Sequence, residues 1–147
     1  MNCCDIFKVF DEKNNLIKEY NHWKLLIRNR NSTLGNCVVI IKRHIENYSD
    51  ITEEEMKEFT QVVKDTENSL KEAFKYDKIN WMMLMMNDKH VHYHVLPRYA
   101  NKKYFAGLEW EDNAWPSMAK IFTERKDELD QEILNQIKEE IKKHISQ

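Results

Sequence analysis

The sequence lacks several features that would place it in a particular class of protein. No apolar run approaches the roughly 20 residues that a bilayer-spanning helix needs. The first five residues do not join a basic region to an apolar stretch, as a secretory signal would. Only three cysteines are present, two of them adjacent, which does not suggest a disulfide framework. We therefore expect a cytoplasmic protein that makes no contact with a membrane.

The sequence also lacks an excess of charge and any sign of a second domain. Its formal net charge is −2, which gives no electrostatic reason to expect binding to nucleic acid. A small anionic ligand would therefore have to be captured locally. No repeat, long linker or low-complexity segment divides the chain. With 147 residues, the sequence predicts a single domain over residues 1–147.

The most informative stretch is residues 89–99, where three of the six histidines stand at every second position. Valine, tyrosine and leucine interleave them and Pro97 ends the run, a composition typical of a β-strand. Alternation along a strand would point His90, His92 and His94 to one face and the apolar residues between them to the other. Alternate side chains lie roughly 7 Å apart on a strand, so the three rings can converge on one small ligand.

Two chemical uses of such a histidine cluster remain open. Three neutral imidazoles and a water resemble a catalytic zinc site. Alternatively, one imidazole nitrogen attacks phosphorus while its neighbours hold the developing negative charge. Unreactive histidines on an edge strand are a third reading, which the regular alternation makes less attractive.

A resemblance favours the second use. Residues 90–96, HVHYHVL, followed by Pro97 and Arg98, resemble the signature of the histidine triad (HIT) superfamily. Residues 34–44 resemble the family strand that follows a glycine, and the helix that starts after Thr52 resembles its long helix. The likeness covers most of residues 1–116 and leaves residues 117–147 as a C-terminal helical extension.

The resemblance implies an α+β fold, with an antiparallel sheet, a long amphipathic helix and a C-terminal helix. It also implies a nucleotide hydrolase that cleaves dinucleoside polyphosphates or nucleoside phosphoramidates at the α-phosphate. His92 would be the nucleophile and form a nucleotidyl-histidine intermediate, with His90 and His94 at the phosphate oxygens. The Pro97-Arg98 tail is similar to the dinucleoside polyphosphate branch (fragile histidine triad-like). No cofactor would be required, although a divalent cation could arrive with the substrate, and family members are commonly homodimers.

Four further residues receive substrate-binding roles from the resemblance. Asn29 stands where relatives bind the ribose. Asn36 replaces a histidine that many relatives carry after the glycine, and Asn87 precedes the triad near the phosphate. Arg98 has a fork of donors that suits a phosphate, and a solvated strand end is its other reading.

Metal binding is a separate question. Some relatives hold a structural zinc through a Cys-x-x-Cys motif and histidines. Here Cys3 and Cys4 are adjacent, so even with His44 nearby we expect no metal. A zinc-dependent hydrolase using the three triad histidines, and a nucleotide-binding sensor without activity, stay as rival functions.

Apolar patterns predict the remaining elements. Thr52 and Glu55 form a capping box, after which apolar residues recur at helical spacing through Phe74. A second amphipathic helix is expected from Met118 to Ile141, which covers the sheet or packs on a partner subunit. Strands are expected at residues 6–10, 16–20, 23–28, 37–41 and 80–86 and at the triad.

Three imidazoles so close together cannot all be protonated near neutral pH, because like charges depress one another's pKa. We expect a neutral His92 whose second nitrogen donates to a backbone carbonyl, which fixes the tautomer. A protonated His90 or His94 is expected beside it at the phosphate.

Overall fold

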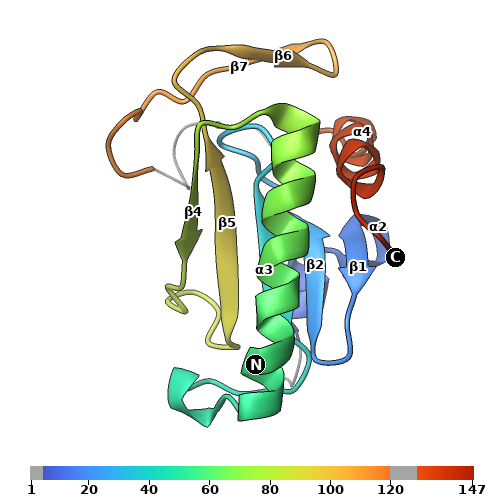
Figure 1. The fold of residues 1–147 in the computed structure, drawn as a ribbon, viewed down its shortest axis with the longest axis vertical. Coiled ribbons are helices and arrows are strands. Elements are labelled where there is room, and N and C mark those ends of the chain that lie inside the picture. Colours follow the sequence, from blue (N-terminus) through green and yellow to red (C-terminus); the bar gives the residue numbers. More distant parts are fainter. Residues whose placement is uncertain (1–4, 120–128) are drawn as a thin grey trace.

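A five-stranded antiparallel sheet forms the centre of the computed structural model, which describes residues 5–119 and 129–147 (Figure 1). The strand order is β1-β2-β3-β5-β4, so β5, which carries the triad, lies between β3 and β4. The strands are β1 (Leu16–Glu19), β2 (Trp23–Ile27), β3 (Cys37–Ile41), β4 (Lys78–Met82) and β5 (His92–Arg98). The predicted α+β class with an antiparallel sheet is thus confirmed.

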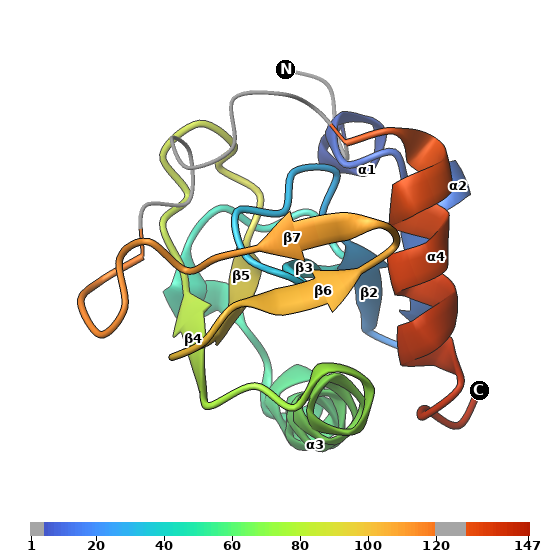
Figure 2. The same ribbon diagram turned by 90° about the horizontal axis from the view of Figure 1, so that it is seen from above.

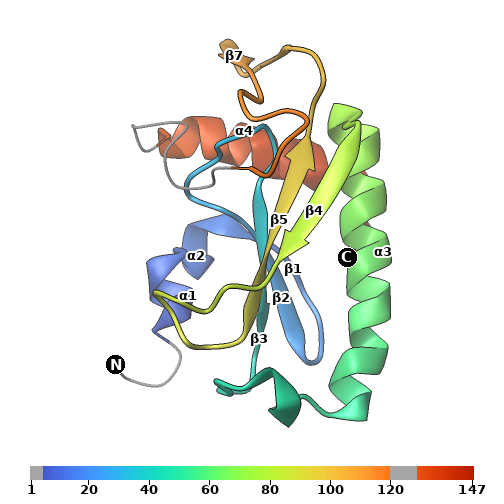
Figure 3. The ribbon, with the colours of Figure 1, turned by 90° about the vertical axis from the view of Figure 1, so that its left-hand side faces the viewer.

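Helices lie on both faces of this sheet (Figure 3). The long helix α3 covers one face, and the short helices α1 and α2 lie on the other. Helix α4 packs against β1, β2 and α3 (Figure 2). Of the two positions expected for the C-terminal helix, on the sheet or on a partner subunit, the structure shows the first. The helices are α1 (Ile6–Val9), α2 (Glu12–Asn15), the 3-10 turn η1 (Tyr48–Asp50), α3 (Glu53–Phe74) and α4 (Gln131–Lys142). A separate hairpin is formed by β6 (Lys103–Phe105) and β7 (Leu108–Trp110).

The start of α3 confirms the predicted capping box. The Thr52 hydroxyl accepts from the Glu55 amide at 3.2 Å, and the Glu55 carboxylate accepts from the Thr52 amide at 2.9 Å. These bonds satisfy amides that a helix start otherwise leaves without partners. The helix runs for 22 residues. Among the described residues, no helix is both long and apolar enough to cross a bilayer.

The two faces of β5 differ as the alternation predicts. Val91, Tyr93 and Val95 point into the main core, which also contains apolar residues of α3 and α4. The opposite face carries the histidines and adjoins a smaller cluster on β2 and β3. At the entry to β3, Gly35 has φ +90°, and a Cβ there would lie 3.0 Å from the Phe74 ring. Glycine is therefore required both by the backbone and by close packing.

One expected strand is a helix. Residues 6–9 form α1 and Phe10 is its C-cap, because Ile6 and Phe10 are four residues apart as well as alternating, so one helical turn places both on the same side. Both are buried, in the cluster with Val38 and Ile40. No strand of the described sheet pairs with this segment.

Two other predicted boundaries were wrong. Strand β4 begins at Lys78 and ends at Met82, opposite His94, so residues 83–91 form a loop instead of a continued strand. The C-terminal helix begins at Gln131, where the Asp130 carboxylate accepts from the Glu132 amide at 3.0 Å. Met118 lies outside any helix. The expected helical positions within residues 120–128 lie outside the described residues.

Candidate functional site

The ring of His92 is held in one tautomer by the main chain. This histidine is the first residue of β5, and its Nδ1 lies 2.6 Å from the carbonyl oxygen of His90. A carbonyl oxygen only accepts hydrogen bonds, so Nδ1 must carry the proton. Nε2 is then the unprotonated nitrogen of the neutral ring. The predicted backbone acceptor for His92 is confirmed.

His90 lies just before β5 and its ring makes different contacts. Its Nε2 donates to the carbonyl of Ile41 at 2.6 Å, and its Nδ1 lies 3.2 Å from Nδ1 of His44. The backbone amide of His90 donates to the Asp88 carboxylate at 3.1 Å. The ring of His90 therefore packs at the C-terminal end of β3, and its backbone amide helps to hold the loop that precedes the triad.

A cavity of about 420 Å³ adjoins the other two triad histidines. Its walls come from the end of α1, the residues after β2, the loop before the triad and β5. The lining residues are Val9, Phe10, Arg28, Asn29, Arg30, Leu84, Met85, Met86, Asn87, Asp88, His92 and His94. His90 is not among them, so the expectation that three rings converge on one ligand holds for two of the three.

Burial shifts all three imidazoles toward the neutral form. Desolvation lowers the pKa of His90 and that of His92. It also lowers the pKa of His94 to about 3, with the charge of Arg28 as the next cause and His92 as a smaller one. The expected protonated neighbour of His92 is therefore disfavoured at neutral pH, because the rings are buried and a cation is already present.

That cation, Arg28, was missed in the sequence. Its side chain is buried, with 5% exposure, and burial followed by the nearby charge of Arg30 lowers its pKa to about 10. The spacing in the sequence could have indicated its position. Arg28 follows Leu26 by two residues, so its side chain lies on the strand face that carries the small apolar cluster. Reading residues 23–28 as an apolar strand hid the charged residue at its end.

Asn29 and Asn87 both lie on the wall of the triad cavity, as their expected roles require. The Asn29 amide also donates to the carbonyl of Val9 at 3.3 Å. Asn36 does not line the cavity. Its carbonyl oxygen accepts from the amide and the hydroxyl of Ser32, both at 2.9 Å, and its NH2 donates to Thr33 at 2.7 Å. Asn36 thus holds the turn between β2 and β3, and a substrate contact is not supported.

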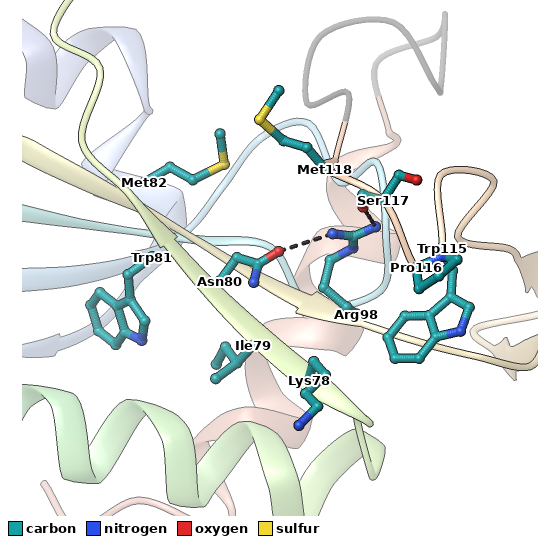
Figure 4. A pocket seen from close by; sticks show the side chains of 10 residues that line it. All are labelled: Lys78, Ile79, Asn80, Trp81, Met82, Arg98, Trp115, Pro116, Ser117 and Met118. Atoms are coloured by element: carbon teal, nitrogen blue, oxygen red, sulfur yellow. Dashed lines mark hydrogen bonds between the residues drawn. The ribbon is translucent and has the colours of Figure 1, made fainter.

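Arg98 also lies away from the triad cavity. It is buried at the other end of β5, where its guanidinium donates to both oxygens of Asp112, at 2.6 and 3.1 Å. Two more donors reach Asn80 and the carbonyl of Ser117, at 2.9 and 2.7 Å (Figure 4). The burial of Arg98 contradicts the expected solvated strand end. Its donors already hold the adjoining loop, so a contact with phosphate stays a prediction that these bonds do not favour.

Arg98 borders a second, more open cavity of about 650 Å³. Figure 4 shows the side chains of Trp81, Met82, Trp115 and Met118 around it. This cavity contains no histidine, so the chemistry indicated by the triad belongs to the first cavity.

No metal site emerges from the described part of the chain. Within residues 5–119 and 129–147, no three histidine, cysteine, aspartate or glutamate side chains are grouped so that they could hold a metal ion. The triad rings instead use Nε2 of His90 and Nδ1 of His92 to bind backbone carbonyls. Cys3 and Cys4 lie outside the described residues.

Comparisons with known proteins agree with this geometry. No curated protein matches the sequence significantly. The structure resembles a hypothetical histidine triad nucleotide-binding protein of Sulfolobus tokodaii, with TM-score 0.70 and 20% identity over 96% of this chain and 91% of that one. A histidine triad protein of Sinorhizobium meliloti gives TM-score 0.72 and 18% identity over 91% and 92%. A zinc-bound histidine triad family protein of Mycobacterium smegmatis gives 0.62 and 17% over 95% and 94%.

At these identities the structural matches speak for the fold alone. The family model described as "HIT domain" matches residues 10–101, which is more than half of the sequence and includes the complete triad. The chain therefore belongs to the HIT domain family.

Proposed function

We propose that this protein hydrolyses dinucleoside polyphosphates or nucleoside phosphoramidates at the α-phosphate, with His92 as the nucleophile. The observation that carries the proposal is the tautomer of His92. Its Nδ1 is committed to the carbonyl of His90, so the lone pair for attack resides on Nε2. The same ring lines a cavity of about 420 Å³, a size suited to a small ligand.

The reaction proceeds in two displacements. In the first, the lone pair of His92 Nε2 forms a bond to the α-phosphorus, and the bond from phosphorus to the leaving oxygen or nitrogen breaks. The leaving group departs with that electron pair and takes up a proton. In the second, a water oxygen bonds to phosphorus, the phosphorus–nitrogen bond breaks, and the water releases a proton. The lone pair of Nε2 is thereby restored.

The carbonyl of His90 has a part in both displacements. Transfer of the nucleotidyl group to Nε2 gives the ring a positive charge, and the hydrogen bond from Nδ1 to the carbonyl stabilises that charge. An acceptor fixed in advance costs no rearrangement during the reaction. Because the carbonyl belongs to the main chain, its position depends on the start of β5 and not on a mobile side chain.

The test is mass spectrometry at neutral pH of the wild-type protein, His92→Ala and the control His144→Ala. His144 lies after α4 and pairs with Glu140, away from the cavity. Each protein is mixed with diadenosine tetraphosphate or an adenosine phosphoramidate, with and without a chelator. We expect products, or an adenylate adduct, from the wild type and His144→Ala but not from His92→Ala, and no effect of the chelator.

Other outcomes point to the rival functions. Turnover that a chelator abolishes and added zinc restores would favour a metal-dependent hydrolase. Nucleotide binding without turnover of either substrate would favour a sensor and would exclude the hydrolase proposal for these substrates. The ratio of the two rates identifies the preferred leaving group.

Homodimer formation remains part of the proposal. Strand β4 is an edge of the sheet, and an edge offers backbone groups for pairing with a second chain. Exposed Met86 and Met118 are also available for burial. Light scattering on the purified protein measures the mass directly, and a monomer at micromolar concentration would remove this part of the proposal. Location in the cytoplasm stays a prediction.

A further inference from the structure

The triad cavity contains a cation that the proposed reaction has not yet used. We propose that Arg28 binds the charged α-phosphate of the substrate and so fills the role expected of a protonated triad histidine. The inference rests on the proposed function, because it names the group that faces the phosphate in that pocket.

The sheet places Arg28 within reach of the triad. Its backbone amide donates to the carbonyl of Asn36 at 2.9 Å, so it continues the pairing of β2 with β3. On the other side of β3, Val38 is opposite His94 of β5. Val38 is two residues further along β3 than Asn36, so the main chains of Arg28 and His94 are separated by two strand spacings across the sheet and two residues along it, roughly 12 Å in all. The arginine and histidine side chains point to the same face and approach each other across this gap, and both line the same cavity.

The position of Arg28 is fixed before any ligand arrives. Its carbonyl accepts from the Asn31 amide at 2.6 Å, and one guanidinium nitrogen, Nη1, donates to the carbonyl of Arg30 at 3.0 Å. Together with its burial, these bonds limit the conformations of the side chain. A preorganised cation in a site shielded from water stabilises negative charge more than the same group at the surface.

The charged residues that line the cavity give it a net positive charge, which favours binding of an anion. Arg28 and Arg30 come from the end of β2, and Asp88 from the loop before β5. Burial and Arg30 lower the pKa of Arg28 only to about 10, so it remains protonated at neutral pH. With His92 and His94 neutral, the formal charge of the lining residues is positive. The planar guanidinium offers paired donors that match two phosphate oxygens.

The presence of Arg28 also disfavours the alternative. Its charge is the largest cause, after burial, of the lowered pKa of His94. A protonated His94 beside this guanidinium would place two like charges in a buried space. Replacing Arg28 by a neutral residue should therefore raise the pKa of His94.

The experiment measures AMP and adenosine binding by calorimetry for the wild type, Arg28→Gln and Arg28→Lys. Lys57→Gln is the control for net charge, since Lys57 is exposed on α3. We expect Arg28→Gln to weaken AMP binding on the order of 10- to 100-fold, the usual effect of losing hydrogen bonds to a charged group. Adenosine binding should be unchanged. Arg28→Lys keeps the charge but not the fork, so its loss for AMP should be smaller.

A titration of the histidine rings by NMR supplies a readout that a purely structural role would not change. The pKa of His94 should rise in Arg28→Gln and stay near the wild-type value in Arg28→Lys and Lys57→Gln. Thermal unfolding checks that each variant is folded. If Arg28→Gln does not fold, Arg28→Lys carries the test, and the ratio of AMP to adenosine affinity cancels any inactive fraction.

Three results would overturn the proposal: wild-type protein that does not bind AMP, unchanged AMP binding in Arg28→Gln, or an equal loss for AMP and adenosine. An equal loss would assign Arg28 to the nucleoside. The proposed hydrolysis is judged separately. A protein that binds AMP through Arg28 yet cleaves neither substrate would leave this inference standing and refute the reaction.

Discussion

Asp112→Ala should destabilise the protein strongly, because it would leave the buried guanidinium of Arg98 without its carboxylate partner. The Asp112 side chain is fully buried and that of Arg98 is 4% exposed. Both carboxylate oxygens accept from the guanidinium, and they also accept from the amides of Tyr99 and Ala114 at 3.3 Å. Removing the carboxylate leaves a desolvated positive charge and two amides that lose a partner.

Breaking a buried ion pair from one side typically costs about 3–5 kcal/mol. A domain of this size has a total free energy of unfolding of roughly 5–15 kcal/mol, so the loss would remove a large part of the stability of the folded variant. Replacing both partners with apolar residues, as in Arg98→Met with Asp112→Leu, should cost less than Asp112→Ala alone. The double variant leaves no uncompensated charge, although the Asn80 and Ser117 oxygens lose a donor.

Urea unfolding followed by tryptophan fluorescence measures these differences at neutral pH. A cost below about 1 kcal/mol for Asp112→Ala would refute the reasoning, since it would resemble an exposed pair. The same samples decide the role of Arg98. Folded Arg98→Met should bind AMP as tightly as the wild type, whereas a large loss of affinity would return Arg98 to the substrate site.

Two further perturbations test the scaffold. Gly35→Ala should cost more than the roughly 1–2 kcal/mol of a left-handed backbone, because its Cβ would press on Phe74. Gly107→Ala, with φ +73° and open space around the Cβ, should cost only the backbone part, and equal losses in urea unfolding would contradict the packing argument. The hydrogen bond from Arg43 lowers the pKa of Glu55 from 4.5 to about 2, so the folded state keeps Glu55 ionised at pH values where the unfolded state binds a proton. This stabilisation is present above pH 4.5 and lost as the pH falls toward 2, and Glu55→Gln should therefore resemble the wild type more closely at pH 3 than at pH 7.

The sequence predicted best those features that depend on local periodicity. Strand β3 was predicted at its observed bounds, because five consecutive apolar residues suit a buried central strand. The capping box and the two faces of β5 follow from spacing in the same way. Residues 6–10 failed because four-residue spacing and alternation coincide in so short a segment, and burial against β3 decided between them.

Long-range pairing accounts for the errors at the site. Arg98 has the residue type of a phosphate ligand, but Asp112 satisfies it from a loop 14 residues away. Arg28 was hidden because its approach to His94 crosses β3, a contact that local sequence does not encode. The resemblance supplied His92, while its backbone acceptor was predicted from tautomer chemistry and its distance came from the structure.

The turn between β2 and β3 constrains how this pocket can change in evolution. Thr33 donates to the carbonyl of Pro97 at 2.6 Å, and Tyr99 donates to the carbonyl of Leu34 at 2.7 Å, so the turn is fastened to the far end of β5. An insertion there would disturb both bonds and the rim formed by Arg28. On the opposite rim, Leu84 and Met86 are exposed, and substitutions of exposed residues cost little stability. New substrate preferences should therefore arise by variation in residues 83–89, which makes that loop the first target for a mutagenesis library.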